Sequence, residues 1–339
     1  MKTDRRSAWR GWLTAALLTL PIAGGARAET LLSDLDYPWD VEVAAGQVVI
    51  TEKPGRIVTF DGRTAERLPV LTSRPILDDR GGGLLGLALR PDFADSRRAV
   101  VYHHTGTPDA RQNRVIEIEA RADGWHETAV LLDAIPGHPL YNGGRVAFGP
   151  DGMLYVTTGW VEDPALPRDR GSLAGKILRL IPDGTIPSDN PFPGSAVWSL
   201  GHRNPQGLAW ASDGTLYASE HGGSTRDEVN VILPGADYGW PDAQGDSVIA
   251  GTEAPLVHSG AETWAPSGVA WSGDRLMVAG LRAGAVLSVD RAGAVSVAHD
   301  AGTRLRDIAA AGDGLLAITT TRSPRRDGPS RDSLLRLAP

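Results

Sequence analysis

An internal repeat constrains the fold of this chain more than any other feature of its sequence. The repeated unit is an apolar segment, a polar turn and a second apolar segment. It is clearest around Asp151-Gly152 and Asp213-Gly214, which stand 62 residues apart. Weaker copies occupy residues 41–50, 87–102, 269–278 and 308–318. Because such units cannot bury their apolar faces alone, they must stack on one another.

The repeat predicts an all-β fold, a six-bladed β-propeller of four-stranded antiparallel blades. An Asp-Gly pair supplies the positive φ of a two-residue hairpin loop, and alternating apolar residues flank each pair. The 41 glycines and 24 prolines argue against a helical bundle. Six stacked blades account for the six copies. A β-sandwich or β-helix is the alternative, although neither predicts a spacing near 60 residues.

The two ends of the folded region are expected to meet in one sheet. The apolar segment 334–337 has the pattern of a strand that completes a blade begun by the mature N-terminus, which would hide the sheet edges. We therefore expect two parts, a signal peptide at residues 1–28 and a single propeller domain at residues 29–339.

The N-terminus has the features of a secretory signal. Basic residues precede an apolar run at 11–23, and Ala26-Arg27-Ala28 has the form of a cleavage site. The apolar run is too short for a stable membrane span, although an uncleaved anchor is the alternative. The Arg5-Arg6 pair leaves the export route open between the general and twin-arginine pathways. A periplasmic or secreted location is predicted, with cleavage after Ala28.

Charge and cysteine content exclude several classes of partner and site. The chain carries a net charge of −7, and removal of the basic signal would make it more acidic. Such a protein should repel nucleic acid and anionic lipid. With no cysteine, neither a disulfide framework nor a cysteine-ligated metal site can form. We expect a monomer or homodimer.

Several polar runs lie just outside the predicted strands, where the loops of a propeller converge on its central channel. They are GHRNPQG at 201–207, EHGG at 220–223, DEVN at 227–230, YGWP at 238–241, NGGR at 142–145, GKILR at 175–179, PDG at 182–184 and RLRD at 304–307.

These runs make the chain similar to the PQQ-dependent soluble sugar dehydrogenases of the glucose/sorbosone dehydrogenase family. The most specific are GHRNPQGL at 201–208, GKILRL at 175–180 and YGWP at 238–241, and the similarity extends from Tyr37 to Leu337. The resemblance implies a six-bladed quinoprotein. Its substrate would be an aldose or related sugar, oxidised at a hydroxyl by hydride transfer to the quinone, with an external electron acceptor.

The resemblance also assigns residues to the cofactor, pyrroloquinoline quinone (PQQ). This flat tricarboxylate requires guanidinium partners. Arg304 and Arg306, two residues apart on one face of a strand, match the family pair that clamps the carboxylates, and Arg282 stands where the family has a lysine. Arg203 and Asn204 match residues near the quinone oxygens, where a cation would stabilise charge on the reduced ring.

Two calcium sites are implied by the same comparison, since the cofactor oxygens need a hard cation. The backbone carbonyls of Gly222 and Gly223 match ligands beside the quinone, and Glu228 and Tyr238 match a structural site. Asp227 and Glu228 could instead be a solvated charge pair, and Tyr238 could serve blade packing. Arg304 and Arg306, taken alone, could equally be surface residues.

The residues that would activate the substrate depart from the family pattern. The proton-accepting histidine is replaced by Tyr141, which is a poor base unless a nearby cation favours its ionised form. Arg145 is a candidate for that cation, and His138 is an alternative base. Relatives carry Gln or Glu at the position of Gly81 and Asp at the position of Trp160.

Three functions therefore remain open. The first is a PQQ-dependent sugar dehydrogenase in which Tyr141, His138 and Arg203 are the catalytic candidates. The second is a catalytically altered propeller that binds a carbohydrate or protein partner without turnover. The third is a calcium-dependent lactonase, which needs several converging carboxylates. Glu220, Asp227 and Glu228 are the only candidates for those carboxylates, and all three come from one repeat.

Overall fold

The computed structural model describes residues 28–338 except residues 313, 326, 327 and 329. In this part of the chain nearly all regular structure is β-strand, and the one helix is a single turn, α1 (Phe93–Ser96). The all-β prediction is confirmed. None of the described helical structure is long and apolar enough to cross a membrane. The predicted signal peptide lies outside the described residues, apart from Ala28.

Four sheets contain four antiparallel strands each. The first is β10 (Gly143–Phe148), β11 (Leu154–Thr158), β12 (Lys176–Leu180) and β13 (Val197–Leu200). The second is β14 (Pro205–Trp210), β15 (Leu216–Glu220), β16 (Glu228–Ile232) and β17 (Val257–His258). The third is β18 (Pro266–Ser272), β19 (Arg275–Gly280), β20 (Ala285–Val289) and β21 (Val295–Asp300). The fourth is β22 (Leu305–Ala311), β23 (Gly314–Thr319), β24 (Asp332–Leu337) and β1 (Glu29–Leu35).

The fifth sheet has eight strands in two antiparallel halves. One half is β2 (Pro38–Ala44), β3 (Gln47–Glu52), β4 (Arg56–Phe60) and β5 (Ala65–Leu71). The other half is β6 (Leu84–Leu89), β7 (Arg98–Thr107), β8 (Ala110–Arg121) and β9 (Gly124–Pro136). A parallel pairing of β5 with β9 joins the halves, and it covers two residue pairs, Val70 with Trp125 and Leu71 with His126.

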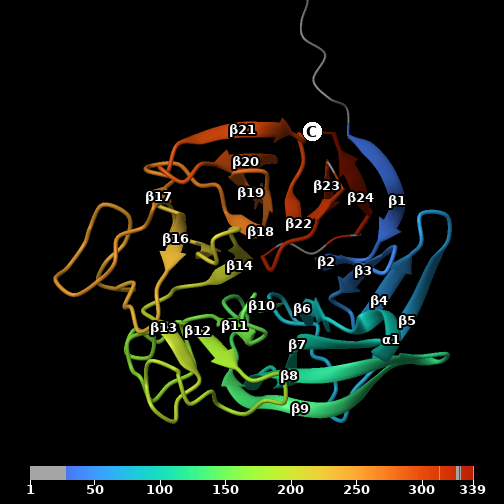
Figure 1. The fold of residues 1–339 in the computed structure, drawn as a ribbon, viewed down its shortest axis with the longest axis horizontal. Helices are drawn as coiled ribbons and strands as arrows, with labels where there is room; N and C mark the ends of the chain where they lie inside the picture. Colours follow the sequence, from blue (N-terminus) through green and yellow to red (C-terminus); the bar gives the residue numbers. More distant parts are fainter. Residues whose placement is uncertain (1–27, 313, 326–327, 329, 339) are drawn as a thin grey trace, which may run out of the picture.

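The inner strands form a closed ring. Strands β2, β6, β10, β14, β18 and β22 contact one another in this order, and β22 returns to contact β2. Figure 1 shows the sheets arranged radially about this ring, as in a β-propeller. Apolar side chains pack between neighbouring sheets: Tyr102 of β7, for example, shares a core cluster with Val146 of β10 and Leu178 of β12. Each sheet thus buries its face against the next, as the repeat requires.

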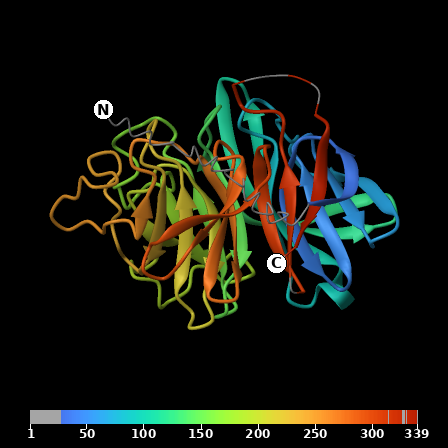
Figure 2. The ribbon, with the colours of Figure 1, turned by 90° about the horizontal axis from the view of Figure 1, so that it is seen from above.

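The N-terminal and C-terminal strands meet in one sheet, as predicted. Strand β1 pairs antiparallel with β24, with Glu29 opposite Arg336 and Thr30 opposite Leu335. In Figure 2 the blue N-terminal strands accordingly lie beside the red C-terminal ones. The pairing covers the free edge of β24 and closes the ring of sheets with hydrogen bonds.

The Asp-Gly turns are longer than the sequence predicted. Gly152 has the expected positive φ of +75°, but the loop between β10 and β11 spans residues 149–153 rather than two residues. The reason is that Asp151 Oδ1 accepts a hydrogen bond from the amide of Met153 (3.1 Å), an Asx turn that widens the connection. The turn at residues 211–215 repeats this arrangement.

Two buried lysines place positive charge inside the fold. Lys176 Nζ donates to the carbonyls of Leu166 (2.8 Å), Pro167 (2.8 Å) and Ala174 (2.6 Å). Lys53 is 1% exposed, and its Nζ lies 3.9 Å from Asp78. Burial lowers the pKa of each lysine to about 7, from an ordinary value of 10.5. The charged form of each lysine therefore destabilises the folded state relative to the unfolded chain.

This burial predicts a pH dependence of stability. Between pH 7 and 10.5 the unfolded chain holds protons on Lys53 and Lys176 that the folded chain does not. The free energy of unfolding should therefore rise with pH, by up to about 1.4 kcal/mol per pH unit for each lysine. Urea unfolding at pH 7 and 9 checks this, and K53M and K176M should each lose about half of the rise. An unchanged rise in both variants would contradict it.

Candidate active site

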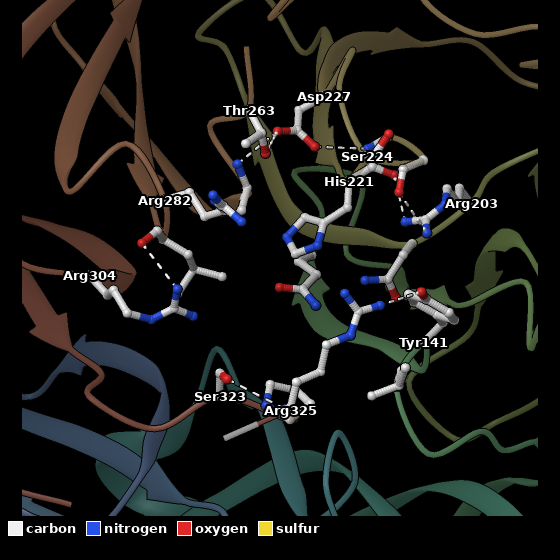
Figure 3. Close-up of a pocket in the computed structure, with 18 of the residues that line it drawn as sticks. Tyr141, Arg203, His221, Ser224, Asp227, Thr263, Arg282, Arg304, Ser323 and Arg325 are labelled. Carbon is white, nitrogen blue, oxygen red and sulfur yellow. Dashed lines mark hydrogen bonds between the residues drawn. The ribbon is translucent and has the colours of Figure 1, made fainter. Parts of the chain in front are cut away.

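A cavity of about 290 Å³ opens where the loops at one end of the inner strands converge (Figure 3). Its lining includes all five residues that the sequence assigned to the cofactor, namely Arg203, Asn204, Arg282, Arg304 and Arg306. It also includes a fifth arginine, Arg325, together with Tyr141, Gly222 and Gly223. These residues come from the loops before β10, β14 and β22 and after β15, β19 and β23, and from β22 itself. Segments far apart in the chain thus meet in one cavity.

Arg306 lies on β22 and is the most deeply buried of the cavity arginines, with 3% of its surface exposed. Its Nη1 donates to Gln206 Oε1 (2.9 Å), and its Nε has no partner. Burial lowers the pKa of Arg306 to about 10, and the nearby Arg304 charge contributes in the same direction. The ion pairs of the described residues include none for Arg306, so this guanidinium is buried without a carboxylate.

Arg304 and Arg282 approach the cavity from the same side (Figure 3). Arg304 Nη1 donates to the Leu281 carbonyl (3.3 Å), and its Nε is buried without a partner. Burial lowers the pKa of Arg304, and the charge of Arg282 lowers it further. Arg282 itself is exposed. Three guanidiniums of like charge therefore face one space, an arrangement that an anion would stabilise.

Arg203 is held by aromatic rings rather than by a carboxylate. Its guanidinium carbon lies 4.6 Å from the ring centre of Tyr141, 5.1 Å from that of Trp240 and 5.8 Å from that of Trp160. Burial lowers its pKa, and its Nε has no partner. Asn204 is fixed beside it, since its Oδ1 accepts from the amide of Gly143 (3.0 Å).

Tyr141 lies on the cavity wall, where its hydroxyl accepts a hydrogen bond from Arg325 Nη2 (2.9 Å; Figure 3). Trp160, one of the departures from the family pattern, lies against it with ring centres 6.0 Å apart. The positions at which the resemblance implies a histidine and an aspartate thus lie side by side. The cations that contact Tyr141 are Arg203 and Arg325.

The suggestion that His138 reaches into the cavity is not supported by its position. Its ring stacks on that of Tyr141 at 5.3 Å and does not belong to the lining that the structure describes. The amides of Leu140 and Tyr141 donate to its Nδ1 (3.1 and 3.3 Å), and its Nε2 lies 3.3 Å from Glu162. Because both ring nitrogens are engaged, His138 positions the Tyr141 loop.

The suggestion that Arg145 supplies the cation beside Tyr141 is wrong. Arg145 Nη1 lies 2.5 Å from Asp40 and 2.9 Å from Asp307, and its guanidinium stacks 4.6 Å from the ring centre of Trp39. These partners lie on β2 and β22, neither of which neighbours β10 in the ring of inner strands, and Arg145 Nε donates to the Gln206 carbonyl on β14 (2.9 Å). Arg145 therefore links inner strands across the ring rather than serving Tyr141.

The loop before β10 fills the space around Gly81. Its amide donates to the Pro139 carbonyl (2.7 Å), and a Cβ at this position would lie 2.8 Å from the carbonyl oxygens of Pro139 and Leu140. A glutamine or glutamate cannot fit there without moving this backbone. Gly81 thus packs directly against the loop that carries Tyr141.

Gly222 and Gly223, the predicted carbonyl ligands, lie in the cavity lining. Asp227 holds this turn, since its Oδ1 accepts from the Gly222 amide (2.9 Å). Asp227 is 3% exposed and also accepts from Trp264 and Ala265, so it is a structural anchor and not a solvated charge. The Gly223 carbonyl faces Arg203 Nη2 at 3.5 Å.

Glu228 and Tyr238 lie apart from this cavity, around a space of about 10 Å³ that they share with Glu220. Burial and the neighbouring Glu220 charge raise the pKa of Glu228 to about 7. The Tyr238 hydroxyl donates to the Val231 carbonyl (2.5 Å). Among the described residues no group of three or more histidine, aspartate or glutamate side chains is placed to hold a metal ion.

The similarity to known proteins agrees with this geometry. The model of the family described as glucose/sorbosone dehydrogenase matches residues 35–329. The chain belongs to the glucose/sorbosone dehydrogenase family. The match covers every cavity residue described above.

Three relatives illustrate the similarity. The PQQ-bound structure of aldose sugar dehydrogenase from Streptomyces coelicolor is 34% identical, with a TM-score of 0.82, and the match covers 91% of this chain and 96% of that one. The aldose sugar dehydrogenase YliI of Escherichia coli is 27% identical, over 92% and 94% of the two chains. The quinoprotein glucose dehydrogenase B of Acinetobacter calcoaceticus is 30% identical, over 64% of this chain and 52% of that protein.

Arg325 and Gln206 are among the residues of this family member's cavity that sequence reasoning missed. Arg325 lies in the irregular loop between β23 and β24, which carries no repeat or motif. Gln206 lies inside the GHRNPQG run, but nothing in its spacing shows that it would hold Arg306. A count of basic residues in loops that follow strands would have made Arg325 a candidate site residue. It would not have shown where the Arg325 side chain lies.

Proposed function

We propose that this chain is a periplasmic PQQ-dependent oxidoreductase that oxidises a hydroxyl of an aldose or related sugar by hydride transfer to the quinone. The observation that carries the proposal is the convergence of Arg203, Arg282, Arg304 and Arg306 on one cavity. Three of them have a buried Nε with no partner. Because a buried, unpaired guanidinium is costly, such a group indicates an anionic ligand.

The donor set of this cavity fits PQQ. Arg282, Arg304 and Arg306 would hold the cofactor carboxylates, with Gln206 keeping the Arg306 guanidinium in place. Arg203, whose guanidinium lies against the rings of Tyr141 and Trp240, would face the quinone oxygens beside Asn204. When bound, PQQ would supply the hydride acceptor for the sugar. Tyr141 stands where the family has its proton acceptor, at the wall that a bound sugar would face.

Calcium at this site is part of the same proposal. The Gly222 and Gly223 carbonyls are the candidate ligands beside the cofactor, and backbone oxygens suit a hard cation. The structural site would use Glu228 and the backbone at Tyr238, next to Glu220. The Glu220 charge raises the pKa of Glu228, and a divalent cation between the two carboxylates would offset that repulsion.

We also propose that the fold is a six-bladed propeller in a single domain at residues 29–339. The two halves of the eight-stranded sheet then count as separate blades, since two residue pairs alone join them. The ring of six inner strands supports this count. The signal peptide at residues 1–28 would direct the chain to the periplasm.

The test is reconstitution of the purified apoprotein. Added PQQ should bind tightly, with one PQQ per chain and more strongly with Ca²⁺, and should change the absorption spectrum. The loaded protein should then reduce an artificial dye when an aldose is present. Binding of PQQ without dye reduction across a panel of sugars would favour the propeller without turnover. Absence of both effects would remove the proposal.

The lactonase alternative finds little support in the cavity. Among its described lining residues the single carboxylate is Asp227, and that carboxylate is engaged by backbone amides. Glu220 and Glu228 face the separate small space.

A further inference from the structure

Arg325 has no role in the cofactor assignments above, although it lies in the same cavity. Its Nη2 donates to the Tyr141 hydroxyl (2.9 Å), and its own amide donates to Ser323 Oγ (3.4 Å). The preceding residue is held as well, since Arg80 Nε donates to the Pro324 carbonyl (3.3 Å). The backbone at residues 324 and 325 is therefore held at two points, and the guanidinium has the Tyr141 hydroxyl as its partner (Figure 3).

We propose that Arg325, oriented by Tyr141, binds the anionic group of the substrate, so that the preferred substrate is an acidic sugar carrying a carboxylate or a phosphate. This inference rests on the proposed function and specifies its substrate class. We call Arg325 and Tyr141 the anion subsite.

The first argument is that the carboxylate and amide oxygens of the cavity side chains are already used. Asp227 accepts four hydrogen bonds, from Gly222 and from residues 263–265. Asn204 Oδ1 accepts from a backbone amide of β10, and Gln206 Oε1 accepts from one of the guanidiniums. A neutral sugar needs acceptors as well as donors, because each hydroxyl both donates and accepts. The wall offers mainly donors, which suit an anion.

The second argument is the geometry of the anion subsite. A guanidinium has five N–H donors and binds a carboxylate or phosphate through two of them. Arg325 uses one of its side-chain donors on Tyr141. The Tyr141 oxygen accepts that bond, and the hydrogen bonds of the described residues give the phenolic hydrogen no acceptor, so it adds a further donor. Trp160 stands beside Tyr141 and brings no negative charge that would repel an anion.

The third argument is the balance of charge. Five arginines and one aspartate line the cavity, whereas the whole chain has a net charge of −7. Four of those arginines are assigned to the three carboxylates and the quinone oxygens of PQQ, and Arg325 is additional to them. An acidic chain does not attract an acidic sugar in general, so the attraction depends on this local surplus of positive charge.

The experiment compares acidic and neutral sugars of one stereochemistry. With PQQ and Ca²⁺ bound, kcat/KM for D-glucuronate or D-glucose 6-phosphate should exceed that for D-glucose by about tenfold or more, and salt should reduce the difference. The two acids distinguish a carboxylate from a phosphate. R325Q should lower the ratio of acidic to neutral kcat/KM about tenfold, and R325K should keep part of it. R63Q, which removes an exposed charge in the turn between β4 and β5, is the control for net charge.

A second measurement separates this inference from the proposed function. Calorimetry on the apoprotein should show tighter binding of D-glucuronate than of D-glucose, and R325Q should remove the difference even when no cofactor is present. If PQQ binds but neutral sugars are preferred and R325Q leaves the ratio unchanged, the anion subsite is refuted while the dehydrogenase proposal stands. If PQQ does not bind and the apoprotein does not distinguish the two sugars, both fail.

Discussion

Replacing Arg306 with methionine should weaken the binding of PQQ by about 2–5 kcal/mol, the cost of removing one partner from a buried charge pair. The reason is its position. Arg306 is 3% exposed and fixed by Gln206, and water cannot screen a buried ion pair as it does an exposed one. Arg282 is exposed, so R282M should cost less. Titration of the apoproteins with PQQ in the presence of Ca²⁺ measures both losses.

The same substitution should have the opposite effect on the stability of the apoprotein. The described part of the chain offers Arg306 no carboxylate, and burial has lowered its pKa to about 10. Methionine keeps the apolar stem and removes the buried charge. The free energy of unfolding should therefore rise, by about 1 kcal/mol or more. A loss of PQQ affinity well below 1 kcal/mol, or a less stable apoprotein, would mean that Arg306 serves the fold and not a ligand.

The fold could be predicted from the sequence to the extent that it depends on local pattern. The Asp-Gly repeats mark hairpins because the glycine takes a positive φ there, as Gly152 does. The pairing of β1 with β24 followed from the need to close a ring of sheets. The lengths of the turns did not follow, because the Asp151 side chain bonds a backbone amide, and neither hydropathy nor spacing records that bond.

The part of the site that lies in recognisable motifs could be predicted from the sequence. The part that lies in irregular loops could not. Side-chain alternation along a strand predicted that Arg304 and Arg306 share a face, and both line the cavity although Arg304 lies just before β22; the GHRNPQG run located Arg203. Arg325 could not be placed, since the path of the loop between β23 and β24 depends on contacts such as that between Arg80 and Pro324. The role given to Arg145 was wrong because its partner Asp307 is 162 residues away.

Those contacts of Arg145 give the second large prediction. Asp40 on β2 and Asp307 on β22 both pair with Arg145 on β10, and Glu42 stands two residues from Asp40. Burial raises the pKa of Asp40, and it raises that of Glu42 to about 7, with the Asp307 charge contributing. The positive charge of Arg145 acts in the opposite direction and lowers the pKa of both carboxyls. R145M should lower the free energy of unfolding at pH 8 by about 3–5 kcal/mol, because two buried carboxylates lose their cation.

The pH dependence of this loss separates charge from packing. A carboxyl whose pKa is raised by folding stabilises the folded state below its unfolded pKa, and that stabilisation disappears as the pH rises through the folded value. Without Arg145 the folded pKa values of Asp40 and Glu42 should rise further. The destabilisation of R145M should therefore be largest at pH 8 and shrink towards pH 5, and D307N in the R145M background should recover part of it. Equal losses in urea unfolding at both pH values would show instead that the Arg145 stem, packed on Trp39, matters more than its charge.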